Sequence, residues 1–179
     1  MDDQPVNAIL TEAREVYGVF GKSPQALKLV DQALAAEPKN VDALNLKASI
    51  LYDLDRDDEA RDLHQQALTV EPHSVEAHHG LAAIANDTGK YAEAFEWTQR
   101  GFRAVPQDPY PEFRENEDYR QRLIAELYNE KAFALWYLGE QEEAARLLTE
   151  EGPEACPLEV ETFEDQLEWL EHHPHSPDE

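Results

Sequence analysis

The chain has one cysteine and few basic residues among its 179 positions, and it has no long apolar run. Cys156 has no second cysteine with which to form an intrachain disulfide, which fits a reducing compartment. No stretch approaches the ~20 apolar residues of a membrane-spanning helix. The opening "MDDQPVNAIL" has neither the basic nor the apolar region of a signal peptide. We therefore expect a cytoplasmic protein that has no membrane partner.

Basic residues are outnumbered, with 15 Lys and Arg against 39 Asp and Glu and a formal net charge of -24. The imbalance is strongest in residues 107–179, which hold 5 of the basic and 21 of the acidic residues. A field of this sign repels nucleic-acid phosphates and speeds association with basic partners. Acidic faces also keep a protein soluble whatever it binds. The sequence excludes a nucleic-acid partner and leaves these two roles of the charge open.

Motifs that support catalysis are missing as well. The sequence has no nucleophile elbow, no Gly-rich phosphate loop and no Cys–His pair. The acidic pairs Asp57-Asp58 and Glu142-Glu143 fall at predicted helix starts, where the helix dipole favours negative charge. We expect a protein that is not an enzyme and that carries no cofactor.

Histidine is the one residue type that raises the question of a metal. His78 and His79 are adjacent, so on a helix they point about 100° apart and cannot both face one ion. The "HHPH" tract at 172–175 can chelate a metal weakly, as any His-rich tract can. Solvated histidines explain both clusters, and we predict no metal site.

The sequence instead contains a repeat with a period of 34 residues. Each unit consists of two segments with helical periodicity, such as Leu44, Ala48 and Leu51 at i, i+4 and i+7. Proline ends each unit because it cannot continue a helix. Small residues recur where the second helix must pass close to a neighbour. The repeated positions are Ala26, Ala60 and Ala94; Ala33, Ala67 and Gly101; and Pro38, Pro72 and Pro106.

These residues resemble the tetratricopeptide repeat, whose unit is a helix–turn–helix of 34 residues. The third unit matches best, with Gly89 at the turn followed by Tyr91 and Ala94. The second unit departs from the pattern at the turn, where Asp55 replaces Gly, and at His64, where the family has a large apolar residue. The resemblance covers roughly residues 7 to 151. It implies an all-α fold, a right-handed α-solenoid of about four such units followed by a C-terminal capping helix.

The expected domain organisation follows from this period. An insertion at 107–122 follows the third unit. Pro109 and Pro111 predict an extended loop there, and one long helix should follow from about residue 115 to 138. After Gly152-Pro153 a last amphipathic helix is expected to cover the apolar end of the array. The predicted segments are units 7–38, 41–72, 75–106 and 115–151, an insertion at 107–122, a capping helix at 152–172 and a disordered tail at 173–179.

The resemblance also implies a concave groove, lined by the first helix of each unit, that binds a peptide or a segment of another protein. Asn side chains there can grip an extended backbone, aromatic residues can form anchor pockets, and carboxylates favour Lys or Arg. We expect Asn45 and Asn86 to be exposed, so that replacing both weakens binding without lowering stability. For Phe133 and Trp136 the alternative is packing against the insertion or the capping helix. The candidates are Thr11, Glu15, Asn45, Ser49, Tyr52, Asp53, His79, Asn86, Asp87, Asn129, Phe133, Trp136 and Tyr137.

One specialisation of the family is excluded by these positions. Members that capture the C-terminal carboxylate of heat-shock chaperones use Lys, Asn and Arg on the groove wall. The matching positions here are Thr11, Glu15, Leu46, Glu76 and Gly80, which offer no cation.

Together these features predict a non-catalytic adaptor or scaffold that binds an extended basic or amphipathic segment of a partner protein. The alternative is a structural protein that self-associates into a homo-oligomer through the insertion and the long fourth-unit helix. Its interface material would be Tyr110, Phe113, Tyr119 and Trp169.

Overall fold

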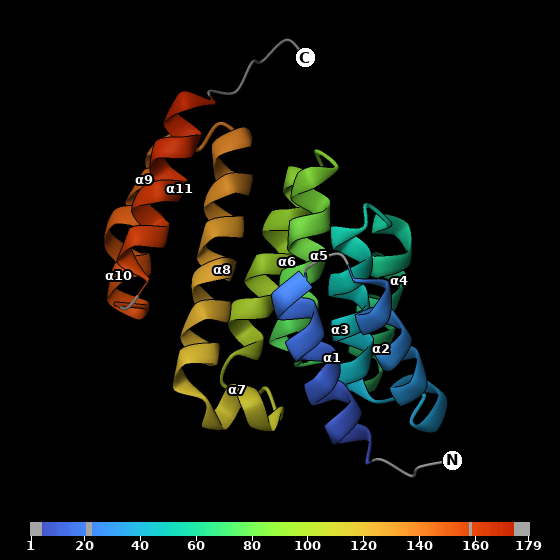
Figure 1. Cartoon of the computed structure of the whole chain (residues 1–179). Helices are drawn as coiled ribbons and strands as arrows, with labels where there is room; N and C mark the ends of the chain where they lie inside the picture. The colour runs from blue at the N-terminus through green and yellow to red at the C-terminus, as the bar shows by residue number, and fades with distance from the viewer. Residues whose placement is uncertain (1–4, 21–22, 158, 174–179) are drawn as a thin grey trace. The chain divides into compact units, whose positions relative to one another are not determined.

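The computed structural model describes residues 5–20, 23–157 and 159–173, and every regular element in these ranges is a helix (Figure 1). This confirms the predicted all-α class and its helix–turn–helix hairpins. The chain divides after Pro72 into two compact units, Met1–Pro72 and His73–Glu179, which are described separately. Residues 174–179, most of the predicted disordered tail, lie outside the described residues.

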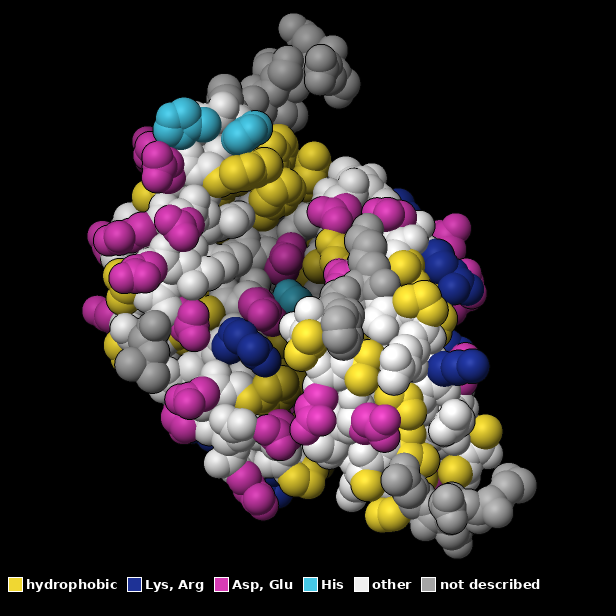
Figure 2. All heavy atoms as spheres, viewed as in Figure 1, with side chains coloured by type: hydrophobic (Ala, Val, Ile, Leu, Met, Phe, Trp, Pro, Cys, Tyr) yellow, Lys and Arg dark blue, Asp and Glu magenta, His cyan; other side chains and the backbone are white. Residues whose placement is uncertain are grey.

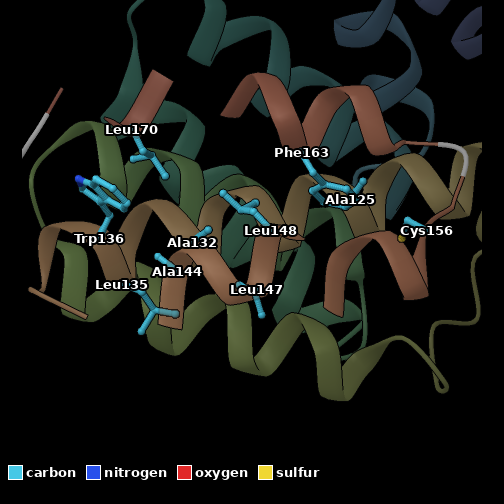
Figure 3. Close-up of a cluster of buried hydrophobic side chains, with 10 residues drawn as sticks. All are labelled: Ala125, Ala132, Leu135, Trp136, Ala144, Leu147, Leu148, Cys156, Phe163 and Leu170. Carbon is cyan, nitrogen blue, oxygen red and sulfur yellow. The ribbon is translucent and has the colours of Figure 1, made fainter. Parts of the chain in front are cut away.

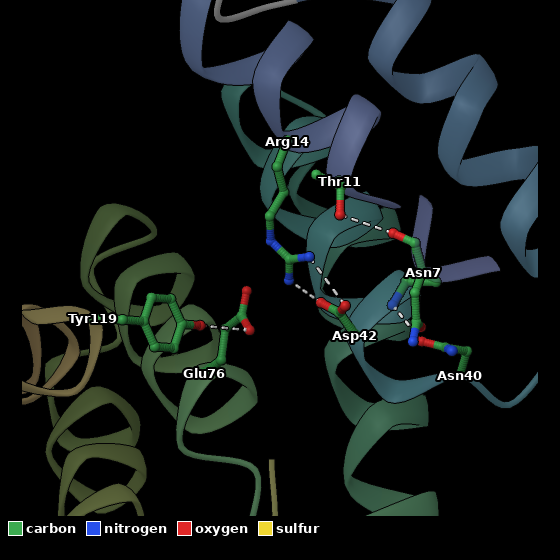
Figure 4. Close-up of polar contacts among 8 residues, drawn as sticks. Asn7, Thr11, Arg14, Asn40, Asp42, Glu76 and Tyr119 are labelled. Atoms are coloured by element: carbon green, nitrogen blue, oxygen red, sulfur yellow. Dashed lines mark hydrogen bonds and ion pairs between the residues drawn. The ribbon is translucent and has the colours of Figure 1, made fainter. Parts of the chain in front are cut away.

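The first unit consists of two helical hairpins around an apolar core. Ser23 and Asn40 cap the second and third helices, since their side-chain oxygens accept hydrogen bonds from Ala26 N and Ala43 N. Arg14 of the first helix pairs with Asp42 of the third (Figure 4). The helices are α1 (Val6–Phe20), α2 (Pro24–Ala36), α3 (Val41–Asp53) and α4 (Asp57–Val70). Buried core residues are Leu10, Ala13, Ala26, Val30, Ala33, Ala43, Leu46 and Ile50.

The second unit begins with a third hairpin, against which a long helix packs. In this unit α8 packs on both α5 and α6, and α11 packs on α8. The elements are α5 (Val75–Asp87), α6 (Tyr91–Ala104), α7 (Pro111–Glu115), α8 (Glu117–Tyr137), α9 (Gln141–Arg146), the π-helix η1 (Leu147–Glu151), α10 (Gly152–Ala155) and α11 (Val160–His172).

The insertion before α8 differs from the extended loop that its prolines predicted. Pro111 starts the short helix α7, because a proline is tolerated in the first turn. Asn116 separates α7 from α8. Its side chain caps α8 by accepting a hydrogen bond from Tyr119 N. The long helix therefore begins at Glu117 rather than 115. Phe113 is 2% exposed and packs with Leu123 and Leu127, so it is core rather than interface material.

Asp108 anchors this insertion to the start of α5. Its side chain is 6% exposed, yet its two oxygens accept hydrogen bonds from Val75 N at 2.7 Å and Tyr110 N at 2.8 Å. Val75 N is one of the donors that a helix N-terminus leaves without an internal partner. A carboxylate at that end is also favoured by the helix dipole.

The C-terminal helices cover the apolar side of α8. Phe163 and Leu170 of α11 are fully buried, and the predicted capping segment is a short α10 followed by α11 from Val160. Cys156 lies in the same core, where burial raises the pKa of its thiol to about 11. Figure 3 shows this core, formed by Ala125, Ala132, Leu135, Trp136, Ala144, Leu147, Leu148, Cys156, Phe163 and Leu170.

Tight turns join the two helices of three hairpins by the same hydrogen-bond pattern. At the turn position the backbone has positive φ, 58° at Asp55, 70° at Gly89 and 89° at Gly139. In each turn the following N–H bonds back to the helix, as Arg56 N does to Leu51 O at 3.0 Å. This is the Schellman arrangement, which favours glycine at the left-handed position. Asp55 therefore occupies a conformation that a side chain disfavours.

We predict that Asp55→Gly stabilises the protein by roughly 0.5–1 kcal/mol, because the left-handed backbone no longer carries a Cβ. Chemical denaturation of the full chain would measure the change. The reciprocal control, Gly139→Ala, should destabilise by about 1–2 kcal/mol. A loss of stability in Asp55→Gly would contradict the argument.

Candidate functional site

In the first unit, the predicted residues Ser49, Tyr52 and Asp53 of α3 are half-buried. The Tyr17 hydroxyl of α1 donates a hydrogen bond to Asp53 at 2.6 Å and lies 3.5 Å from the backbone oxygen of Ser49. Tyr52 is half-buried, whereas Thr11 of α1 is exposed. The Asp53 carboxylate is therefore already engaged within the unit.

Asn45 is not exposed as expected. It is 1% exposed, and its Oδ1 lies 3.1 Å from Nδ1 of the equally buried His64 on α4. The reason is the position of α3 in the unit, where it packs against both α2 and α4. The His64 that breaks the family pattern is thus paired with a polar residue, which satisfies both groups in the core.

Asn86 on α5 is buried in the same way. It is 4% exposed, and its Nδ2 donates to Glu130 of α8, at 2.7 Å to the carboxylate and 3.0 Å to the backbone oxygen. Its Oδ1 is buried and accepts no hydrogen bond from the described residues. Asn86 therefore joins α5 to α8 and does not face a partner directly.

Trp136 is the third predicted groove residue, after Asn45 and Asn86, that is buried in the core. It is 8% exposed and packs with Leu148 and Leu170 (Figure 3), as the alternative interpretation of the aromatic residues proposed. Asn129 is half-buried, with its Oδ1 buried and without a hydrogen-bond partner among the described residues.

In the second unit, carboxylates of α8 lie on either side of the predicted residue His79. Its Nδ1 lies 3.8 Å from a carboxylate oxygen of Glu126, and its Nε2 lies 3.9 Å from one of Glu130. Desolvation raises the pKa of Glu130, as do the charges of Asp87 and Glu126, while His79 and Asn86 oppose the rise. Sequence reasoning missed Glu126 and Glu130. Their spacing of four residues was a usable signal, since it places both on one face of α8.

An aromatic cluster continues the same side of α8. The ring of Phe133 lies 4.8 Å from Tyr137 and 5.5 Å from Trp169 of α11. Tyr91 stacks on Tyr137 at 4.8 Å, and His173 stacks on Trp169 at 4.2 Å. Trp169 remains 42% exposed. Figure 2 shows hydrophobic side chains gathered beside histidines at the end of this unit, where α8 and α11 finish.

These two groups form one surface, which we call the α5–α8 face. Phe133 and Tyr137 follow Glu130 by three and seven positions, so they share its side of the helix. The surface therefore offers carboxylates at one end and aromatic rings at the other. Its members are His79, Asp87, Glu126, Glu130, Phe133 and Tyr137, flanked by Tyr91 and Trp169.

No three or more His, Cys, Asp or Glu side chains in the described ranges are grouped so as to hold a metal ion. None of the helices described is both long and apolar enough to cross a membrane.

Packed helical hairpins that present a charged and aromatic helix face define a helical-repeat protein. A family model, the tetratricopeptide repeat, matches residues 15–69 and 58–109, which together exceed half of the chain. The chain belongs to the tetratricopeptide repeat family. This fold supports a role in protein–protein interaction.

Solved structures give the same fold. One crystal structure of MamA protein has a TM-score of 0.64 at 14% identity and covers 89% of this chain and 78% of its own. A second crystal structure of MamA has a TM-score of 0.61 at 13% identity, with coverages of 96% and 83%. Likeness at these identities concerns the fold alone. No curated protein matches the sequence.

We predict that Asn45→Ala destabilises the protein by about 1–3 kcal/mol, because it removes a hydrogen-bond partner from buried His64. Ser49→Ala, one turn along the same helix, is the control and should change stability by less than about 0.5 kcal/mol. Urea denaturation measures both. Equal effects would show that the Asn45–His64 contact contributes nothing.

We predict that Glu130→Gln raises the melting temperature at neutral pH, by about 2–4 °C if the gain is near 1 kcal/mol. The raised pKa of Glu130 means that its ionised form is disfavoured in the folded state. Its contribution to stability is therefore complete below the pKa of the unfolded chain and is lost as pH rises through the folded pKa. Glutamine is neutral and keeps an oxygen for Asn86.

The pH profile tests the cause of this change. The difference between Glu130→Gln and wild type should shrink towards zero as pH falls to about 4.3, the ordinary glutamate value. Glu164→Gln, which removes an exposed carboxylate of α11, is the control for charge alone. The explanation fails if both variants give the same profile.

Proposed function

We propose that the chain is a non-catalytic adaptor whose α5–α8 face binds a basic, amphipathic segment of another protein. The observation that carries this proposal is the placement of Glu126 and Glu130 on the same side of α8 as the rings of Phe133 and Tyr137. Carboxylates attract Lys or Arg, and aromatic rings accept apolar side chains or cations.

The charge balance of the face favours a basic ligand over an acidic one. The carboxylates of Asp87 and Glu126 act on the carboxyl group of Glu130. The basic side chain in the two ion pairs that Glu126 and Glu130 form is His79. Because burial disfavours the ionised form of Glu130, a ligand cation beside this carboxyl group would lower the cost of ionising it. The net charge of -24 adds long-range attraction at low salt.

The spacing of the face supports one form of ligand. Glu130 and Tyr137 are seven residues apart on one helix, which is about 10 Å at 1.5 Å per residue. An extended segment covers that distance in about three residues at ~3.3 Å each. We therefore propose a Lys or Arg followed about three residues later by an aromatic or large apolar side chain.

The absence of catalysis is part of the proposal, since a raised carboxyl pKa can also mark an active site. Here one Glu130 oxygen accepts from Asn86, and the neighbouring carboxylates lie with it on a helix face rather than in a closed cavity. No Ser, Thr or Cys is among the residues that form the face. Desolvation between packed helices explains the pKa of Glu130 without a reaction.

The remaining sequence predictions stay proposals. Ser49, Tyr52 and Asp53 are candidate contacts of the first unit, and Asn129 is a candidate beside the α5–α8 face. We also propose that the hairpins α1–α2, α3–α4, α5–α6 and α8–α9 are the repeat units, and that α11 is the capping helix.

Self-association is the weaker proposal for the insertion. Phe113 is buried, and the Tyr119 hydroxyl donates to Glu76 within the same unit at 3.0 Å (Figure 4). Of the four aromatic residues proposed for such an interface, Trp169 has the largest exposure, at 42%.

We predict that a labelled peptide with Lys and Trp three residues apart binds the full chain, and that the same peptide with Glu in place of Lys does not. Fluorescence anisotropy measures the affinity. The double variant Glu126→Gln/Glu130→Gln should lower it at least about tenfold, and wild-type affinity should fall as salt rises.

The matched control is Glu161→Gln/Glu164→Gln, which removes the same charge from exposed positions of α11. Its affinity should stay within about twofold of wild type. Equal losses in the two double variants would mean that net charge, rather than the α5–α8 face, attracts the peptide. Dimerisation in a dilution series, with no peptide binding, would favour self-association instead.

A further inference from the structure

The other side of α8 borders a hollow of opposite character. It has a volume of about 430 Å³ and opens to solvent between α6, α8 and η1. Its lining consists of Gln99, Phe102, Arg103, Tyr128, Lys131 and Glu151.

Two cations converge on this hollow without an acidic partner. Neither Arg103 nor Lys131 forms an ion pair with any carboxylate of the described residues, unlike Arg100, Arg120 and Arg146 of the same unit. Lys90, Arg114 and Arg122 form no ion pair among these residues either, so what distinguishes Arg103 and Lys131 is that they line one hollow. In a chain with 39 acidic and 15 basic residues, two free cations at one hollow are a concentrated positive site. The one lining carboxylate, Glu151, is partly neutralised by Arg146 at 3.2 Å.

Aromatic rings and further donors complete the lining. Phe102 and Tyr128 meet edge to face with centroids 4.7 Å apart, and Lys131 Nζ lies 5.9 Å from the Phe102 ring. The Tyr128 hydroxyl and the Gln99 amide form no hydrogen bond with other described residues. Partial burial raises the pKa of Tyr128, so its hydroxyl remains a donor at neutral pH. The hollow thus combines charged and neutral donors with an apolar wall.

This site is separate from the α5–α8 face. At 100° per residue, Lys131 and Tyr128 lie about 100° and 160° around α8 from Glu130. A ligand in the hollow therefore does not contact the carboxylates of the α5–α8 face, and the two sites can be tested independently.

We propose that the hollow binds an acidic segment of another protein, with a carboxylate between Arg103 and Lys131 and a neighbouring apolar side chain against Phe102 and Tyr128. A guanidinium and an ammonium match a carboxylate in charge and hydrogen bonding. The rings contribute the apolar contact that makes such a pair selective.

A carboxylate suits the site better than a phosphate group. A phosphomonoester carries a charge of about -1.5 to -2 at neutral pH, so the net charge of -24 and the nearby Glu151 repel it more strongly than a singly charged carboxylate. The number of free cations, two, also matches one or two carboxylates rather than a polyanion.

The test uses a labelled octapeptide with two Glu residues beside one Trp, and the full chain. We expect it to bind, and Arg103→Gln/Lys131→Gln to weaken binding at least tenfold. Lys90→Gln/Arg114→Gln is the matched control, because it removes two unpaired cations outside the hollow and should change affinity less than twofold. The peptide with Gln in place of both Glu residues should bind at least tenfold more weakly.

The remaining outcomes separate this proposal from the preceding one. The Lys–Trp peptide should not displace the acidic peptide, and Glu126→Gln/Glu130→Gln should not weaken its binding. Equal losses in the two cation variants, or equal affinity for the Gln peptide, overturn the hollow as a carboxylate site. Displacement by AMP at lower concentration than by the unlabelled peptide overturns the choice of carboxylate over phosphate.

Discussion

The structure depends on close contact between helices at positions that tolerate almost no side chain. Gly101 of α6 is the clearest case, because a Cβ there would lie 2.8 Å from the Leu127 side chain of α8 and 3.3 Å from His78 Cβ of α5. Ala33 and Ala67, at the same place in the earlier repeats, are fully buried. Helices that approach this closely are held at a fixed separation and rotation. In the second unit that constraint sets α8 beside both α5 and α6, and so determines which of its residues are exposed.

One helix can therefore carry two surfaces of opposite charge. The side of α8 towards α5 presents Glu126 and Glu130, and the side towards the hollow presents Lys131 and Tyr128. A short amphipathic helix buries one side in the core and exposes the opposite side. Here α8 spans 21 residues, and its buried residues are Leu123, Ala125, Leu127, Ala132, Ala134, Leu135 and Trp136. The half-buried side chains between them include Glu126, Tyr128, Glu130 and Lys131.

Much of the fold could be predicted from the sequence, because the repeat period and the prolines depend on local chemistry. The turn at Asp55 was located even though it lacks the usual glycine. The burial of Asn45 and Asn86 could not be predicted, since periodicity gives the rotation of a helix but not how many neighbours surround it. Glu130 and Asp108 were missed for a related reason: their partners, Asn86 and Val75, are distant in sequence. Only packing reveals that a charged residue is half-buried or caps another helix.

The contact of Asp108 with Val75 limits how freely the repeats can be exchanged. In a simple array each hairpin starts with its own cap and could be duplicated, deleted or moved. The third hairpin has its own cap at Ser74, but the N–H of its first residue, Val75, also donates a hydrogen bond to the carboxylate of Asp108, which follows its last helix. Cutting the chain after Pro106, or joining another repeat there, would leave the Val75 N–H without that acceptor. The third hairpin and the insertion are therefore coupled by this hydrogen bond. We expect whole repeats to be exchanged more readily before Val75 than after it.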